Sequence, residues 1–198
     1  MNMVKEITIA DIVDRETYGR VRKERRRHMI AVKKLRRMEV GPYATFHFES
    51  RETMVAQIQE MLWIENGGEE QLADELGAYN PLVPNGRELV ATLMFEIPDE
   101  VKRDQELRRL SGVEDLISIK VGDHQVQATP EIADGVERTK EDGKTSSVHF
   151  LHFPFTEAQI DAFRSDDNDV ILSVGHENYG HLAVMSKDTR TVLAADFD

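Results

Sequence analysis

A block of positive charge within one helical segment constrains the fold of this chain more than any other feature. Residues 20–37, RVRKERRRHMIAVKKLRR, hold ten Lys or Arg and one acid, a local charge of +9 in a chain whose net charge is −12. The other residues therefore carry −21, the difference between −12 and +9. Since like charges in one segment repel one another, we expect the block to contact acidic parts of the same fold or of a second subunit.

Side chains in this region recur with the period of an α-helix. Asp14 is suited to cap a helix, and Gly41-Pro42 is a turn signal. We therefore predict a long basic helix that begins after Asp14 and ends near Gly41. Six residues recur by threes and fours and share one stripe, which Arg25 and His28 interrupt with polarity: Tyr18, Val21, Arg25, His28, Val32 and Leu35. The helix would pack against the rest of the domain through Tyr18, Val21, Val32 and Leu35.

The rest of the chain alternates between strand and helix patterns without a regular βαβ rhythm. Strand patterns occupy 43–50, 88–98, 144–155 and 169–175, a hairpin pattern surrounds Gly122-Asp123, and 176–181 is typical of a loop. Helix patterns occupy 51–65, 69–76 (ended by Gly77), 99–111, 156–164 and 186–196. The fold class predicted is α+β: a single domain over residues 1–198, with a mainly antiparallel sheet, a long basic N-terminal helix and several shorter helices.

Composition excludes several classes of function. The chain has no cysteine, which removes disulfides, thiolate nucleophiles and iron–sulfur clusters. No apolar run suggests a membrane span, and the N-terminal acids argue against a signal peptide, so we expect a cytoplasmic protein. Gly-x-Gly-x-x-Gly and P-loop patterns are absent, and we expect no cofactor. Nucleic acid is an unlikely partner because the acidic remainder of the chain would repel it.

The segment KTSSVHFLHFPF, residues 144–155, raises the question of a site. His149 and His152 are three apart on a predicted strand, so they point to opposite faces and cannot share a metal. His149 could instead bind a metal with His176 or His181 from the later loop, alongside Glu49 or Glu65. The favoured interpretation is that His149 donates to a backbone carbonyl inside the sheet. Lys144 and the hydroxyls of the following Thr145 and Ser146 could bind an anion or form an ordinary turn.

Several stretches together resemble a bacterial family of uncharacterised proteins, number 3501 among the domains of unknown function. They are AVKKLRR, GPYATFHFE, QIQEML, AYNPLVPNG, GVED and KTSSVHFLHF. The resemblance implies a cytoplasmic protein whose gene neighbours encode rubrerythrin-like diiron proteins and iron–sulfur oxidoreductase subunits. Val32 and His152 depart from the family's His and Arg. The positions that match are Arg36, Arg37, Glu49, Gln57, Glu60, Tyr79, Asn80, Lys144, Thr145, Ser146, His149 and His176.

Three hypotheses of function follow, and the residues do not decide whether the protein is an enzyme. The first is an accessory or partner protein in a redox or peroxide-stress context, which is the context that the resemblance implies. The second is a small-anion-binding enzyme or sensor that uses Arg36, Arg37, Lys144 and the neighbouring hydroxyls. The third is a metal-binding protein that uses His149, His176 and a carboxylate, although we expect no metal site. We also expect a homodimer, because the basic block invites association with an acidic surface.

Overall fold

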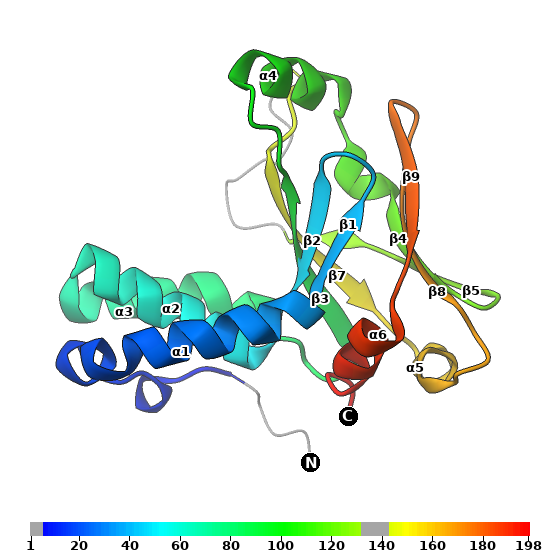
Figure 1. Cartoon of the computed structure of the whole chain (residues 1–198). Coiled ribbons are helices and arrows are strands. Elements are labelled where there is room, and N and C mark those ends of the chain that lie inside the picture. Colours follow the sequence, from blue (N-terminus) through cyan, green and yellow to red (C-terminus); the bar gives the residue numbers. More distant parts are fainter. Residues whose placement is uncertain (1–5, 132–142) are drawn as a thin grey trace.

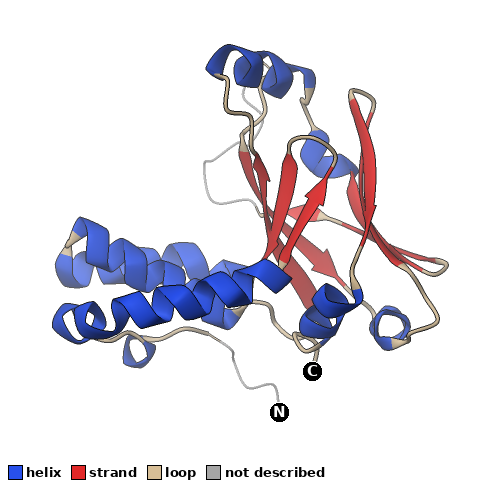
Figure 2. Cartoon of the chain, viewed as in Figure 1, coloured by secondary structure: helices blue, strands red, loops and turns tan. Residues whose placement is uncertain are grey.

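The computed structural model describes residues 6–131 and 143–198 and has an α+β fold with two antiparallel sheets. Helices α1, α2 and α3 lie together on one side of the five-stranded sheet, and the four-stranded sheet lies on its other side (Figure 1). Helix α4 is at one end of the sheets, and α5 and α6 are at the opposite end (Figure 2). Within the described ranges, no helix is both long and apolar enough to cross a bilayer.

The five-stranded sheet has the order β1-β2-β3-β7-β6, and each neighbouring pair is antiparallel. Its alternating apolar residues follow the predicted pattern, because Ala44, Phe46 and Phe48 are all buried on one face. The strands are β1 (Arg37–Val40), β2 (Ala44–Phe48), β3 (Glu88–Phe95), β6 (Thr129–Pro130) and β7 (Val148–Pro154).

The four-stranded sheet has the order β5-β4-β8-β9 and is also antiparallel throughout. The predicted hairpin around Gly122-Asp123 is confirmed, and Gly122 supplies the positive φ of +55° that the tight turn requires. The strands are β4 (Ile117–Val121), β5 (His124–Gln127), β8 (Val170–His176) and β9 (Tyr179–Val184).

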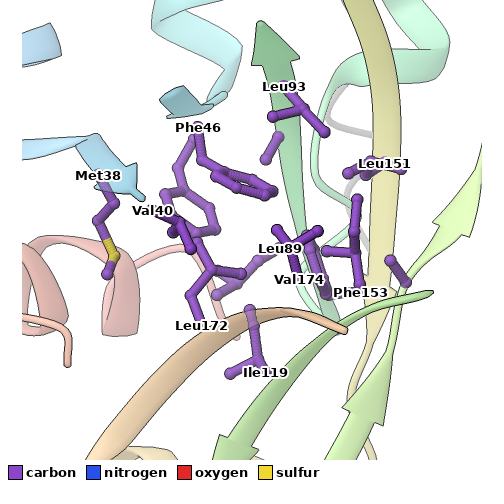
Figure 3. Packing of buried hydrophobic residues seen from close by; sticks show 14 of the residues in the cluster. Met38, Val40, Phe46, Leu89, Leu93, Ile119, Leu151, Phe153, Leu172 and Val174 are labelled. Carbon is purple, nitrogen blue, oxygen red and sulfur yellow. The ribbon is translucent and has the colours of Figure 1, made fainter. Parts of the chain in front are cut away.

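The main hydrophobic core lies between the two sheets. Figure 3 shows Phe46, Leu151 and Phe153 of the five-stranded sheet packed toward Ile119 and Leu172 of the four-stranded sheet. All five side chains are completely buried. Burying a side chain of this size stabilises the folded state by about 1.5–3 kcal/mol, so this layer fixes the two sheets against each other.

The first three helices form a separate layer with a smaller core. They are α1 (Arg15–Leu35), α2 (Arg51–Glu65) and α3 (Gly68–Tyr79). Asp14 and Ser50 cap α1 and α2 by accepting hydrogen bonds from Thr17 N and Thr53 N. The smaller core joins α2 to the outer face of β3 through Met54, Ile58, Leu82, Val83, Val90 and Ile7.

The remaining helices are short and each begins at a predicted cap. They are α4 (Glu100–Arg109), α5 (Glu157–Arg164) and α6 (Lys187–Ala194), capped by the side chains of Asp99, Thr156 and Ser186. Three 3-10 turns complete the described elements: η1 (Ile9–Asp11), η2 (Asn80–Leu82) and η3 (Val113–Leu116).

The predicted end of the basic helix was wrong. Helix α1 ends at Leu35, and Gly41-Pro42 instead makes the turn of the β1–β2 hairpin, where Gly41 has φ +69°. Met38 and Val40 are buried while Arg37 and Glu39 are exposed, which is strand alternation within a four-residue segment. The hydroxyl of Tyr179 donates to Val40 O at 2.7 Å and so fixes this hairpin to β9.

The predicted packing stripe of α1 is confirmed in part: Tyr18 is buried and Val21 and Val32 are half-buried, but Leu35 is 39% exposed. Arg25 and His28, the polar interruptions of the stripe, are exposed. The physical reason is that α1 packs along α2 rather than across the sheet. Two further boundaries differ: α3 continues through Gly77 to Tyr79, and the predicted loop 176–181 is a tight hairpin between β8 and β9.

Candidate functional site

Arg36 follows the end of α1 and is buried. Its guanidinium donates to both carboxylate oxygens of Asp196, at 2.8 and 2.6 Å, and to Glu49 O at 3.3 Å. In a bidentate pair of this kind, the two Nη groups of the guanidinium each donate to one oxygen of the carboxylate. Arg36 therefore joins the α1–β1 junction to the C-terminal end of α6.

Arg37 and Lys144 contact different carboxylates in different parts of the fold. Arg37 is half-exposed and pairs with Glu39 at 2.6 Å and Glu96 at 3.3 Å. Lys144 Nζ lies 2.5 Å from Asp104 of α4. The three cations of the small-anion hypothesis thus each have their own carboxylate, and the structure does not bring them to one anion site.

Glu49 is buried where β2 meets α2. Its two carboxylate oxygens accept hydrogen bonds from Thr53 Oγ1 at 2.6 Å and Thr92 Oγ1 at 2.7 Å. Two hydroxyl donors compensate part of the cost of burying this carboxylate. Glu49 therefore links β2, β3 and α2 from inside.

His149 is completely buried on β7, on the same face as Leu151 and Phe153, as the strand alternation predicted. Its Nε2 lies 2.9 Å from Ser146 O and 3.2 Å from Thr145 Oγ1. Because a carbonyl can only accept, Nε2 carries the proton in this contact. Thr145 is buried too, while the Ser146 hydroxyl accepts from Val148 N.

His176 ends β8 and is buried. Its Nε2 lies 3.2 Å from Ser111 O, and its Nδ1 accepts a hydrogen bond from Asn178 N at 3.1 Å. A ring that donates at one nitrogen and accepts at the other is a neutral imidazole with both positions occupied. Over residues 6–131 and 143–198, no cluster of three or more His, Asp or Glu is arranged to hold a metal ion.

Tyr79 and Asn80 lie at the end of α3. The Asn80 side chain accepts from Ile7 N at 2.7 Å and donates to Ile7 O at 2.9 Å, which fixes the N-terminal segment against the helix layer. The Tyr79 hydroxyl accepts from Gln57 Nε2 at 3.4 Å. These two residues therefore hold chain segments together and do not reach His149.

A groove of about 950 Å³ runs along the seam between α1 and α2. Apolar side chains line it although they are accessible to solvent: Ile30 is 70% exposed and Ile64 is 65% exposed. The partly buried Met29 and Met61 lie between them along the two helices. Contiguous apolar surface of this kind is a signature of a binding site.

Cations also line this groove: Arg25, Arg26, Lys33, Lys34 and Arg37. Among the described residues, no carboxylate lies within ion-pair distance of Arg26, Lys33 or Lys34. Asp11, Glu52 and Glu60 also line the groove, so its five Lys and Arg side chains exceed its three carboxylates. Excess cations beside apolar side chains favour an anionic ligand that is itself partly apolar.

Glu60 connects the two walls of the groove. Its carboxylate accepts from Tyr18 Oη at 2.6 Å and from Arg22 Nε and Nη2 at 3.0 and 2.8 Å. Burial opposes its ionisation, but the hydrogen bonds from Arg22 and Tyr18 lower the pKa of Glu60 below its usual value. The expected contact between the basic segment and an acidic part of the same fold therefore exists here.

Trp63 packs on α1 beside this contact. The Arg15 guanidinium lies 4.8 Å from the centroid of the Trp63 ring, and the rings of Trp63 and Tyr18 meet edge to face. A Cβ at Gly19 would approach the Trp63 ring to 2.8 Å, so glycine permits this close approach. Trp63 thus faces α1.

His47 closes the end of the groove nearest the sheet. It is half-buried on β2. Burial lowers its pKa, and the charges of Arg37 and Lys33 act in the same direction against the opposing effect of Glu49. The ring is consequently neutral near pH 7 and can donate one hydrogen bond and accept another.

The groove was not among the predicted sites. The signal that could have found it is Met29-Ile30 within the cationic run, two apolar residues on the charged part of α1. The depth of the groove depends on where α2 lies, which no local pattern of α1 determines.

Comparisons with known proteins agree on the fold. The comparison with curated proteins found no match. A crystal structure at 1.90 Å of a novel protein of unknown function from Burkholderia pseudomallei K96243 is 34% identical, with a TM-score of 0.88 over 97% of this chain and 99% of that chain. The family described as "Protein of unknown function (DUF3501)" matches residues 6–197. The match covers nearly the whole chain and confirms the resemblance found in the sequence, so the chain belongs to the DUF3501 family.

Proposed function

We propose that this protein is an accessory protein without catalysis of its own, and that it binds an acidic amphipathic helix of a partner protein in the groove between α1 and α2. One observation carries the proposal: exposed apolar side chains and cations without a carboxylate partner line the same groove. A helix with one apolar face and acidic flanks would satisfy both features at once.

The apolar part of the groove supplies the affinity. Ile30 and Ile64 are 70% and 65% exposed, and covering them removes apolar surface from water at about 25 cal/mol per Å². Met29 and Met61 are unbranched and can adapt to the side chains of a partner. Leu or Phe residues spaced by three and four along a partner helix would occupy this seam.

The cations supply the selectivity. Arg26, Lys33 and Lys34 would pair with Glu or Asp on the flanks of the bound helix. The part of α1 that lines the groove extends from Tyr18 to Lys34, about 24 Å at 1.5 Å per residue. This length suits a partner helix of four to five turns.

Charge also argues against two other occupants. A symmetric dimer through the groove would bring the α1 helices of the two copies together, and the cations of the two helices would repel one another. A nucleic acid would meet the cations but leave Ile30 and Ile64 without apolar partners.

The partner protein in this proposal belongs to the redox or peroxide-stress system that the family resemblance implies.

A designed peptide tests the proposal directly. The probe is a fluorescein-labelled 18-residue helix with Leu at one face and Glu on its flanks, and the readout is fluorescence anisotropy. We expect Ile30→Asp, and separately Lys33→Glu combined with Lys34→Glu, to weaken binding at least about tenfold, which is about 1.4 kcal/mol. Matched controls are Val101→Asp on α4 and Lys23→Glu on α1, which are exposed and lie outside the groove lining.

The specificity controls use the same assay. A peptide of identical composition with Leu and Glu scrambled should bind more weakly, because it has no apolar face. Equal binding of the scrambled peptide, or an unlabelled DNA or RNA oligonucleotide that competes better than the amphipathic peptide, would contradict the proposal. Binding that survives Ile30→Asp and the Lys pair unchanged would contradict it as well.

A further inference from the structure

The four-stranded sheet has one face in the main core and one face open to solvent. Alternation along β8 and β9 puts Ile171, Ser173, Leu182 and Val184 on this face, and the strand register adds Ser118 and Lys120 of β4 and Gln125 and Gln127 of β5. Ser118 is itself buried and accepts a hydrogen bond from Gln125. These eight residues define the outer sheet face. The helices in Figure 1 lie beside the five-stranded sheet or at the ends of the two sheets, and the outer sheet face looks away from them.

The outer sheet face carries little charge and exposes two aliphatic side chains. Leu182 is 65% exposed and Val184 is 58% exposed, and Val184 pairs across the strands with Ile171. Lys120 is the one charge among the eight residues of this face, whereas 31% of the whole chain is charged. Depletion of charge around exposed aliphatic side chains is the composition of an interface core.

Charge at the edge of the face selects a second copy as its occupant. Exposed acids lie at both ends, Glu177 in the β8–β9 turn and Asp169 before β8. In the part of the chain that the structure describes, no carboxylate is within ion-pair distance of Lys120. Lys120 lies beside Ile171, toward the Asp169 end of the face, so a two-fold axis that runs across the strands between the two faces would place Lys120 of each protomer over the Glu177 end of the other.

The neutral centre of the face strengthens this choice. A chain with a net charge of −12 repels its own copies over most of its surface, but Ser173, Leu182 and Val184 can meet themselves without like-charge contacts. Two sheets stacked face to face would bury these side chains as the sheets of a β-sandwich do. We propose that the protein forms a two-fold homodimer through the outer sheet face.

The oligomeric state of full-length variants tests this dimer. We expect light scattering coupled to size exclusion to give a dimer mass for the wild type and a monomer mass for Leu182→Glu. Val101→Glu, a change at a similarly exposed aliphatic residue on α4, should remain dimeric. Circular dichroism checks that each variant is folded. Lys120→Glu should raise the dimer dissociation constant several-fold.

A second measurement remains decisive if Leu182→Glu fails to fold. The chain has no native cysteine, so Leu182→Cys can be joined to its own copy by a short bismaleimide without side reactions. We expect a covalent dimer from Leu182→Cys and none from Val101→Cys. A monomeric wild type at every soluble concentration, a dimeric Leu182→Glu, or equal cross-linking of the two cysteine variants would overturn the proposal. None of these outcomes depends on peptide binding in the groove.

Discussion

His152 lies between two carboxylates on the outer face of β7. Its Nδ1 is 2.9 Å from Glu88 Oε2 in a hydrogen bond, and its Nε2 is 2.9 Å from Glu131 Oε2 at ion-pair distance but outside hydrogen-bonding geometry. The hydrogen bond that His152 donates to Glu88 raises the pKa of His152 above its usual value, and together with the charges of both glutamates it outweighs the opposing effect of burial. The charged imidazolium is therefore the form that this site stabilises.

The stability of the fold should depend on this charge. Because the folded pKa of His152 is raised, its contribution is fully present below the unfolded pKa of about 6.5 and is lost as pH rises through the folded pKa. We expect His152→Gln to lower the free energy of unfolding by about 1–3 kcal/mol at pH 6 and by less at pH 9. Urea unfolding at several pH values measures this difference. An equal loss at both pH values would rule out the charged interaction.

His149 shows what the sequence of one strand can predict at the residue scale. The alternation of KTSSVHFLHFPF placed His149 with Leu151 and Phe153 and on the face opposite His152, and both statements are confirmed. The edge of the Phe95 ring also meets the His149 ring. Phe95 comes from β3, so this neighbour depends on the register between β3 and β7, which the sequence does not contain.

At the scale of elements, the pair between Arg36 and Asp196 fixes the C-terminal helix to the rest of the fold. The two side chains are 9% and 10% exposed and join residues 160 positions apart. Removing one partner from such a pair leaves a buried charge without compensation. We expect Asp196→Ala to lower the free energy of unfolding by about 3–5 kcal/mol, measured by urea denaturation.

A double variant separates two effects on the free energy of unfolding: the destabilisation by an unpaired buried charge and the stabilisation by the ion pair itself. Arg36→Met combined with Asp196→Leu fills similar volume without charge, and it should regain most of the stability that Asp196→Ala loses. A double variant as unstable as Asp196→Ala would show that the geometry of the pair, rather than the orphaned guanidinium, matters most.

Elements with a cap and a clear period could be predicted, and short or tertiary features could not. Asp14, Asp99, Thr156 and Ser186 each begin a helix as predicted, because capping is a local interaction. Strand β1 has only four residues and follows a helix directly, so its alternation could not be distinguished in the sequence from a continuation of the helical pattern. Its pairing with β2 and its contact with Tyr179 stabilise it, and Tyr179 lies 139 positions away in sequence from Val40.

The same limit applies to the groove. The sequence does not identify which acid of α2 contacts the basic helix: Glu65, which ends α2, is exposed and accepts from Gln71. Glu60 takes that role with Arg22, 38 residues away. Which acid meets α1 depends on the rotation of α2 about its axis, and packing of Ile58 and Met54 on the sheet sets that rotation.

At the scale of the whole molecule, the two proposed surfaces lie on opposite sides of the five-stranded sheet. The groove belongs to the α1–α2 layer, and the outer sheet face belongs to β4, β8 and β9 (Figure 1). A dimer through the outer sheet face would leave both grooves open and facing away from the two-fold axis. The molecule would then present two equivalent sites to acidic helices, and a partner with two such helices would gain affinity from binding both.

This arrangement predicts the stoichiometry of peptide binding. Isothermal titration of the wild type should give two amphipathic peptides per dimer with one dissociation constant. Monomeric Leu182→Glu should bind one peptide with the same constant within about twofold, because sites far apart contribute additively to within about 0.5 kcal/mol. Ile30→Asp should lose the peptide and keep the dimer mass. One peptide per dimer, or a large change of the constant in Leu182→Glu, would show that the two surfaces overlap or are coupled. Since the core between the sheets separates them, we expect neither.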